Sequence, residues 1–166
     1  MNLDGFAAMF AYKDPIIELV TRFKYGGNLN AGRLLKALVR EYLRLHPTLL
    51  EGADLLLPVP TRADRLLKRG LNVPAFLIDQ PGLTLELRAL KKSRRTQVQA
   101  GLHSKERAKN LAFAFEARPQ LVEGRSLLIF DDVCTTGATL EQIAHTCKKA
   151  GAAEVRALVL ARVVKG

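Results

Sequence analysis

The fold of this chain is decided by one stretch of its sequence, Leu127-Leu128-Ile129-Phe130-Asp131-Asp132-Val133-Cys134-Thr135-Thr136-Gly137-Ala138-Thr139. A short apolar run is followed by two acids, then by a turn of small and hydroxyl residues, and then by an amphipathic segment. This order predicts a buried strand over 126–130 and a helix over 139–150. Because ligands bind at the carboxyl ends of the strands in an open parallel sheet, the turn is the predicted ligand site.

The residue types in this turn indicate which ligand it would hold. Hydroxyl groups and backbone N–H groups at the start of a helix suit an anion such as phosphate. Gly137 allows the backbone to approach that anion closely. Asp131 and Asp132 would repel a phosphate beside them, but they can accept hydrogen bonds from two neighbouring hydroxyls, as on a ribose. Acids for a sugar diol next to donors for a phosphate predict a phosphorylated pentose.

Two other nucleotide-binding patterns are absent from this stretch. It has neither the Gly-x-x-x-x-Gly-Lys of a P-loop nor the Gly-x-Gly-x-x-Gly of a dinucleotide site. A purely structural alternative is that Asp131 and Asp132 end a strand and cap a helix. One acid would suffice for that task, and the run of threonines would be unnecessary, so we favour the ligand site.

The remaining sequence predicts strands that alternate with helices. Asp14-Pro15 would open a helix, with Asp14 as its cap, and Gly26-Gly27 would end it. Further elements are expected as a helix over 31–45, a strand over 54–59, a short helix capped by Asn72, a strand over 83–90 and a strand over 155–163. Apolar strands of this kind, buried on both faces, predict an α/β fold with a parallel sheet.

Size and charge restrict the function classes. The chain has 166 residues, which fits one domain, and 26 Lys plus Arg against 16 Asp plus Glu give a net charge of +10. This balance favours a polyanionic partner, either a pyrophosphate-bearing nucleotide or nucleic acid, although solvated basic faces are an equal alternative. No run is apolar enough to insert into a membrane, and residues 1–9 do not resemble a signal peptide, so we expect a cytoplasmic protein.

The stretch 127–139 resembles the phosphoribosyl pyrophosphate-binding signature of type I phosphoribosyltransferases. Other segments resemble, in the same order, the ComF family, whose members are tied to DNA uptake in natural transformation. These segments are Phe23-Lys24-Tyr25-Gly26-Gly27, Leu57-Pro58-Val59-Pro60, Lys68-Arg69-Gly70-Leu71-Asn72, Arg94-Arg95-Thr96-Gln97-Val98-Gln99 and Glu106-Arg107-Ala108-Lys109-Asn110. The resemblance covers about residues 12–162. Two family features are missing here: an N-terminal four-cysteine zinc ribbon, and a Gln-Ala pair where this chain has Val73-Pro74.

The resemblance implies a type I phosphoribosyltransferase (Rossmann-like) fold with a small N-terminal helical hood over 1–50 and an α/β core over 51–166. It also implies a role for each site residue. Asp131 and Asp132 would bind the ribose hydroxyls. The 5′-phosphate would be held by Cys134, Thr135, Thr136, Gly137, Ala138 and Thr139. The pyrophosphate would be bound by Val59, Pro60, Thr61 and Arg62, with Arg65 as an alternative to Arg62, and by Arg94, Arg95 and Arg107. Mg²⁺ is expected through the ligand, without protein residues dedicated to it.

Two functions remain open at this point. The first is transfer of a phosphoribosyl group from 5-phosphoribosyl 1-pyrophosphate to an acceptor, with Phe23, Lys24 and Tyr25 as candidates for contacting that acceptor. The second is a non-catalytic module that senses a nucleotide-like ligand and binds single-stranded DNA or a helicase and translocation proteins of DNA uptake. A transcriptional regulator is disfavoured because no helix-turn-helix segment is visible.

Overall fold

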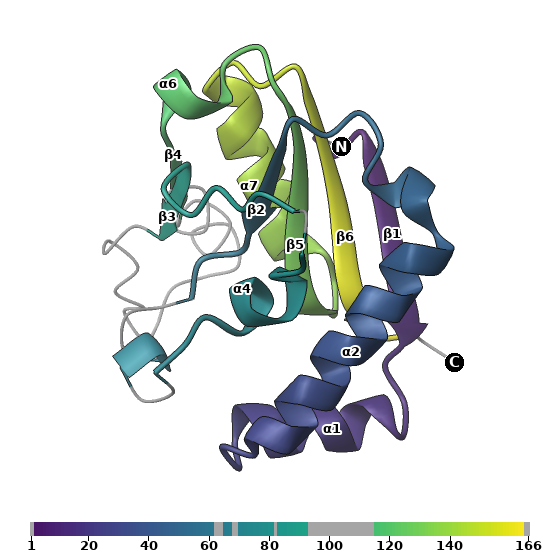
Figure 1. Cartoon of the computed structure of the whole chain (residues 1–166). Helices are drawn as coiled ribbons and strands as arrows, with labels where there is room; N and C mark the ends of the chain where they lie inside the picture. Colours follow the sequence, from purple (N-terminus) through teal and green to yellow (C-terminus); the bar gives the residue numbers. More distant parts are fainter. Residues whose placement is uncertain (1, 62–64, 68–69, 82, 93–114, 165–166) are drawn as a thin grey trace.

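In the computed structural model, a four-stranded parallel sheet forms the centre of the molecule (Figure 1). The structure describes residues 2–61, 65–67, 70–81, 83–92 and 115–164. The elements are β1 (Gly5–Ala11), α1 (Ile16–Lys24), α2 (Leu29–Leu45), η1 (Pro47–Leu49), β2 (Leu55–Pro58), α4 (Val73–Ile78), β3 (Leu90–Lys92), β4 (Phe115–Ala117), α6 (Pro119–Val122), β5 (Ser126–Cys134), α7 (Ala138–Lys149) and β6 (Glu154–Arg162).

The sheet has the order β1-β6-β5-β2, and all three neighbouring pairs are parallel. In addition, β3 and β4 form a small antiparallel pair. The predicted α/β fold with a parallel sheet is therefore confirmed. No helix of the described residues has both the length and the apolar character needed to cross a membrane.

Alternation along β5 explains why both faces of the sheet are buried. Leu127 and Ile129 pack into the cluster that contains the buried face of α7. Leu128 and Phe130 point the other way, into the cluster formed with α1, α2 and α4. Because neighbouring residues of a strand face opposite sides, this apolar run supplies two cores at once.

Helices α1 and α2 lie together on one side of the sheet, and we call this pair the hood (Figure 1). Phe23 of α1 is buried against Gly32 of α2, where a Cβ atom would lie 2.5 Å from the Phe23 ring. The absence of a side chain at position 32 therefore lets the two helices approach closely. Asn28 caps α2 by accepting a hydrogen bond from the N–H of Ala31.

Several local predictions need correction. Asp14 does not cap α1, since Pro15 occupies the N-cap position and no side chain caps the helix. No strand runs over 83–90; Leu85 makes one bridge to Leu56, and a strand begins only at Leu90. Strand β5 does not end at Phe130 but continues through the two acids to Cys134, because β6 pairs with it along this length.

The first strand, β1, was not predicted. Glycine and alanine are poor strand formers, so the segment Gly5–Ala11 shows no clear strand pattern. It becomes a strand because β6 offers it a parallel pairing edge. The division of the chain at residue 50 stays a prediction, and β1 places part of the N-terminal segment in the central sheet.

Candidate functional site

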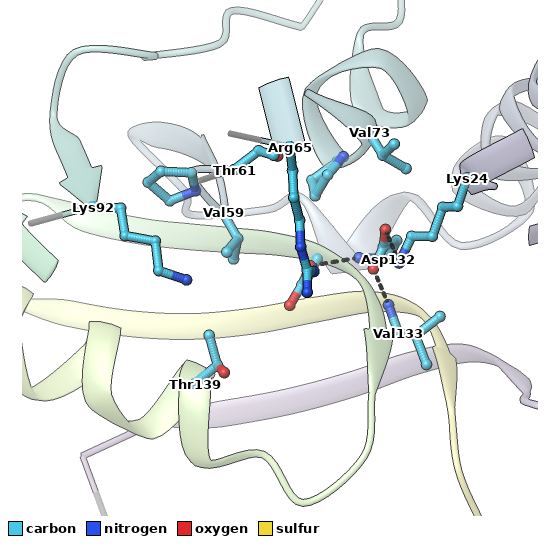
Figure 2. A pocket seen from close by; sticks show the side chains of 12 residues that line it. Lys24, Val59, Thr61, Arg65, Val73, Lys92, Asp132, Val133 and Thr139 are labelled. Atoms are coloured by element: carbon cyan, nitrogen blue, oxygen red, sulfur yellow. Dashed lines mark hydrogen bonds and ion pairs between the residues drawn. The ribbon is translucent and has the colours of Figure 1, made fainter. Parts of the chain in front are cut away.

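A cavity of about 380 Å³ opens beside the carboxyl ends of β2 and β5 and the start of α7. We call it the central cavity. Its lining residues are Lys24, Val59, Pro60, Thr61, Arg65, Val73, Pro74, Lys92, Asp131, Asp132, Val133 and Thr139. Figure 2 shows Lys24, Arg65 and Lys92 reaching towards it from different sides. The structure thus brings the predicted ribose residues, one predicted phosphate residue and part of the predicted pyrophosphate loop to one place.

The two acids occupy consecutive positions of β5 but have different surroundings. Asp131 is partly buried, and its Oδ1 accepts a hydrogen bond of 2.9 Å from the N–H of Asp132. Asp132 is only 6% exposed, and its Oδ1 accepts one of 2.7 Å from the N–H of Val133. Because neighbouring strand residues point to opposite faces, adjacent carboxylates need not do the same task.

Lys24, the last residue of α1, forms an ion pair with Asp132. Its Nζ lies 2.6 Å from Oδ2 of Asp132, and the two side chains are 16% and 9% exposed. A buried carboxylate is costly unless a cation compensates it, and Lys24 supplies that cation. From the sequence, Lys24 was a candidate for contacting an acceptor, and no pattern indicated this ion pair.

The electrostatics of the pair make Asp131 unusual. Burial, and next the negative charge of Asp132, raise the pKa of Asp131 to about 7, although Lys24 and Lys92 act in the opposite direction. This carboxyl therefore changes its protonation state near neutral pH. Perturbed carboxyl groups in clefts are typical of functional sites.

The threonine-rich turn lies between the central cavity and a second hollow. Thr139 lines the central cavity. Cys134, Thr136 and Gly137 instead line a hollow of about 430 Å³ on the side of the N-terminal segment. Gly137 has a φ of 80°, a left-handed conformation that favours glycine, and α7 begins directly after it. Thr135 and Ala138 are exposed in the same turn.

Cys134 is buried within this turn. Burial raises the pKa of its thiol, so the neutral form dominates at physiological pH. Cys147 lies in the core, where burial raises its pKa to about 12. These surroundings favour a packing role for both residues over a nucleophilic one.

The loop after β2 is held in place by its neighbours. The N–H of Val59 donates to the carbonyl of Phe130 at 2.8 Å, which joins the loop to β5. Asn72 donates from Nδ2 to the carbonyl of Val59 at 3.1 Å, while its Oδ1 accepts from the N–H of Ala75 at 2.9 Å. Asn72 thus caps α4, as predicted, and also fixes the loop that lines the cavity.

The predicted pyrophosphate residues have mixed outcomes. Val59, Pro60 and Thr61 line the central cavity, and so does Arg65. The predicted residues Arg62, Arg94, Arg95 and Arg107 lie outside the described residues. Lys92, which lines the same cavity, was missed, because no local feature of the sequence separates it from other basic residues. Val73 and Pro74 also line the cavity, at the two positions where the sequence departs from the Gln-Ala pair of the family that it resembles.

A third hollow of about 360 Å³, the hood cavity, adjoins the central one. Its lining residues are Phe23, Lys24, Tyr25, Gly26, Gly27, Leu29, Leu71 and Val73. Lys24 and Val73 line both cavities. The three residues predicted to contact an acceptor therefore surround one hollow next to the acidic pair.

Comparison with known proteins identifies the class of this fold and site. A family model described as a phosphoribosyl transferase domain matches residues 65–166. Competence protein F of Haemophilus influenzae is 33% identical over 161 residues, covering 91% of this chain and 69% of that protein. The chain therefore belongs to the ComF family of phosphoribosyltransferase-fold proteins.

Two further relatives, compared by sequence, agree with this assignment. DNA utilization protein YhgH of Escherichia coli (strain K12) is 31% identical over 159 residues, covering 92% of this chain and 70% of that protein. Competence protein ComFC of Streptococcus pneumoniae is 24% identical over 158 residues, with coverages of 93% and 67%. Among solved structures, an allosteric regulatory enzyme of purine biosynthesis shows 23% identity and a TM-score of 0.45, covering 64% of this chain and 22% of its own.

Proposed function

We propose that this chain binds 5-phosphoribosyl 1-pyrophosphate in the central cavity and serves DNA uptake or utilization in the cytoplasm. The observation that carries the proposal is the content of that cavity. Two carboxylates at the end of β5 lie beside a threonine hydroxyl at the start of α7 and the loop after β2, with three basic side chains around them. This combination of acceptors for hydroxyl groups and hydrogen-bond donors for anions suits a phosphorylated pentose that carries a pyrophosphate.

Each part of the ligand has matching residues. The ribose hydroxyls would lie at the acidic pair, and Thr139 with the adjoining turn would hold the 5′-phosphate. The pyrophosphate would face Thr61, Arg65 and Lys92. If a phosphoribosyl group is transferred, the bond from the anomeric carbon to pyrophosphate breaks as the acceptor forms the new bond. Basic side chains aimed at the leaving pyrophosphate would stabilise the charge that develops there.

Mg²⁺ would bind at this site together with the ligand. No group of three or more His, Cys, Asp or Glu side chains gathers among the described residues. Magnesium favours oxygen ligands and is commonly bound through substrate phosphates. The pyrophosphate and ribose oxygens would therefore hold it, and the ion would neutralise part of the ligand's charge.

The names of the relatives support the cellular part of the proposal. Two of them carry "competence" in their names, and a third is called a DNA utilization protein. The hood cavity would take the acceptor, since Phe23, Lys24 and Tyr25 line it next to the acidic pair. The non-catalytic alternative, a ligand sensor that binds single-stranded DNA or a helicase, is supported by the net charge of +10 and these same names.

Calorimetric titration of 5-phosphoribosyl 1-pyrophosphate with Mg²⁺ tests the proposal. The native chain is expected to bind, and Asp131→Asn/Asp132→Asn is expected to lose binding while remaining folded by circular dichroism. Absence of binding by the folded native chain would sink the ligand proposal. Pyrophosphate release with an acceptor would favour the enzyme. Salt-sensitive binding of single-stranded DNA without release would favour the module.

A further inference from the structure

The carboxylates of Asp131 and Asp132 differ in how many of their oxygens already bind a described residue. In Asp132, Oδ1 is bonded to the N–H of Val133 and Oδ2 to Nζ of Lys24. In Asp131, Oδ1 accepts from the N–H of Asp132, and Oδ2 has no hydrogen bond to a described residue. A ligand hydroxyl can therefore reach a carboxylate oxygen of Asp131 more readily than one of Asp132.

Burial strengthens this difference. Asp132 is 6% exposed and its partner Lys24 has a side chain that is 16% exposed. Displacing Lys24 would leave two poorly solvated charges without partners, which is strongly unfavourable. A neutral sugar hydroxyl cannot replace an ammonium group as the partner of a buried carboxylate.

We propose that the two acids have different tasks: Asp131 accepts the ligand's hydroxyls, and Asp132 binds Lys24, which is thereby a positioning residue of the central cavity. This inference rests on the proposed function, because it assigns tasks within the same ligand site. Lys24 affects the ligand through Asp132. It neutralises that carboxylate and connects the end of α1 to β5, beside the central cavity.

The position of Lys24 gives the ion pair a second consequence. Lys24 lines both the central cavity and the hood cavity, so it stands at their boundary. A ligand in one cavity and a ligand in the other would both lie beside Lys24. Replacing Lys24 and Asp132 should therefore change ligand binding in the central cavity, while Asp131 and the residues predicted to hold the phosphate stay in place.

A change of charge at Lys24 or Asp132 should shift the pKa of Asp131 in a predictable direction. Among the described residues, the charges of Asp132 on β5, Lys24 on α1 and Lys92 on β3 act on Asp131, and Arg65 lines the same cavity. Loss of the Lys24 cation should raise the pKa of Asp131 further above about 7, since Asp132 would no longer be compensated. Loss of the negative charge of Asp132 should instead lower the pKa of Asp131. Because an ionised carboxylate accepts hydroxyl hydrogen bonds best, binding in Lys24→Met should require a higher pH than in the native chain.

The test compares Asp131→Asn, Lys24→Met and Lys24→Met/Asp132→Asn by calorimetry with 5-phosphoribosyl 1-pyrophosphate and Mg²⁺ between pH 6 and 9. Hydrogen bonds to charged groups lead us to expect binding roughly 100-fold weaker in Asp131→Asn at pH 7. Lys24→Met should bind roughly tenfold more weakly at pH 7 and recover as the pH rises. Adding Asp132→Asn to Lys24→Met should strengthen binding at pH 7 again, because the uncompensated charge is gone.

Three outcomes separate this inference from the proposed function. No binding by the folded native chain would overturn the proposed function itself. Binding by the native chain, with Lys24→Met/Asp132→Asn at least as impaired as Asp131→Asn, would overturn only the division of tasks. An unshifted pH profile in Lys24→Met, with Lys24→Arg as the charge-preserving control, would show that Lys24 is a structural contact alone. Thermal unfolding of each variant checks that it is folded.

Discussion

The two walls of the central cavity are built in different ways. One wall comes from a single strand–turn–helix segment, in which Asp131, Asp132 and Val133 on β5 and Thr139 on α7 line the cavity. The other wall is assembled from three separate stretches of the sequence: the end of α1 at Lys24, residues 59–74 from the loop after β2 to α4, and Lys92 on β3. The first wall depends on the backbone of one strand–turn–helix unit. The second depends on packing, so changes far from the cavity should disturb it.

The largest effect on stability is expected at a buried residue on whose packing both walls depend. Phe130 is fully buried on β5 and belongs to the cluster formed with α1, α2 and α4. Truncation of a buried aromatic residue costs about 3–5 kcal/mol, so Phe130→Ala should lower the free energy of unfolding by that amount. Urea denaturation measures it, with the exposed Phe6→Ala as control. If Phe130→Ala lowered the free energy of unfolding no more than Phe6→Ala does, the two walls would not depend on the packing of Phe130.

A smaller effect is expected from a change in the hood alone. An added Cβ at Gly32 would lie 2.5–2.8 Å from three atoms of the buried Phe23 ring. Overpacking typically costs about 1–3 kcal/mol, so Gly32→Ala should destabilise the chain by that amount and displace α1 with Lys24. Thermal unfolding and ligand titration should both detect it, whereas Asn30→Ala on the exposed side of α2 should change neither. Native-like binding in a clearly destabilised Gly32→Ala would show that the second wall tolerates movement of α1.

Two helix caps offer a matched pair that separates stability from binding. Asn28 and Asn72 each accept a hydrogen bond from an N–H in the first turn of a helix, but only Asn72 also bonds to Val59. Loss of such a cap costs about 1 kcal/mol, so both alanine variants should be destabilised by about that amount, with a further loss in Asn72→Ala from its bond to Val59. Asn72→Ala should in addition bind 5-phosphoribosyl 1-pyrophosphate more weakly, because the loop after β2 loses its anchor. Equal binding by the two variants would show that the loop needs no such anchor.

The smallest effect is expected at the outer surface of the hood. Lys36 pairs with Asp79 at 3.1 Å and lies over the Phe76 ring, but the Asp79 side chain is 67% exposed. Exposed ion pairs contribute about 0–1 kcal/mol, so Lys36→Met should change stability by no more than that and leave ligand binding intact. Calorimetry and thermal unfolding check both points. A large loss of binding would mean that the hood transmits changes from its outer surface to the cavity.

The sequence predicted the first wall well because its information is local. The apolar run before Asp131, the turn around Gly137 and the amphipathic segment after it predicted a strand and a helix that the structure confirms. The cap at Asn72 was also predictable, since it acts within one turn of its own helix. The ligand roles of these residues stay predictions.

The second wall was harder to predict. Lys24 and Lys92 carry no local signal that distinguishes them from other basic residues. Strand β1 was missed for a related reason, because its small residues form a strand only through the neighbouring edge of β6. Asp14 failed as a cap because α1 begins after Pro15, a detail of backbone geometry that the residue types do not specify.

By itself, the sequence determined the parallel α/β class and the pairing of two acids with a threonine-rich turn, since both follow from residues adjacent in the chain. Only the tertiary structure decided that Lys24 neutralises Asp132, that Asn72 holds the loop after β2, and that Asp131 accepts a hydrogen bond from the N–H of Asp132 while it lines the cavity. These contacts join segments distant in sequence, and burial of the hood and the sheet sets their distances and their electrostatic strength.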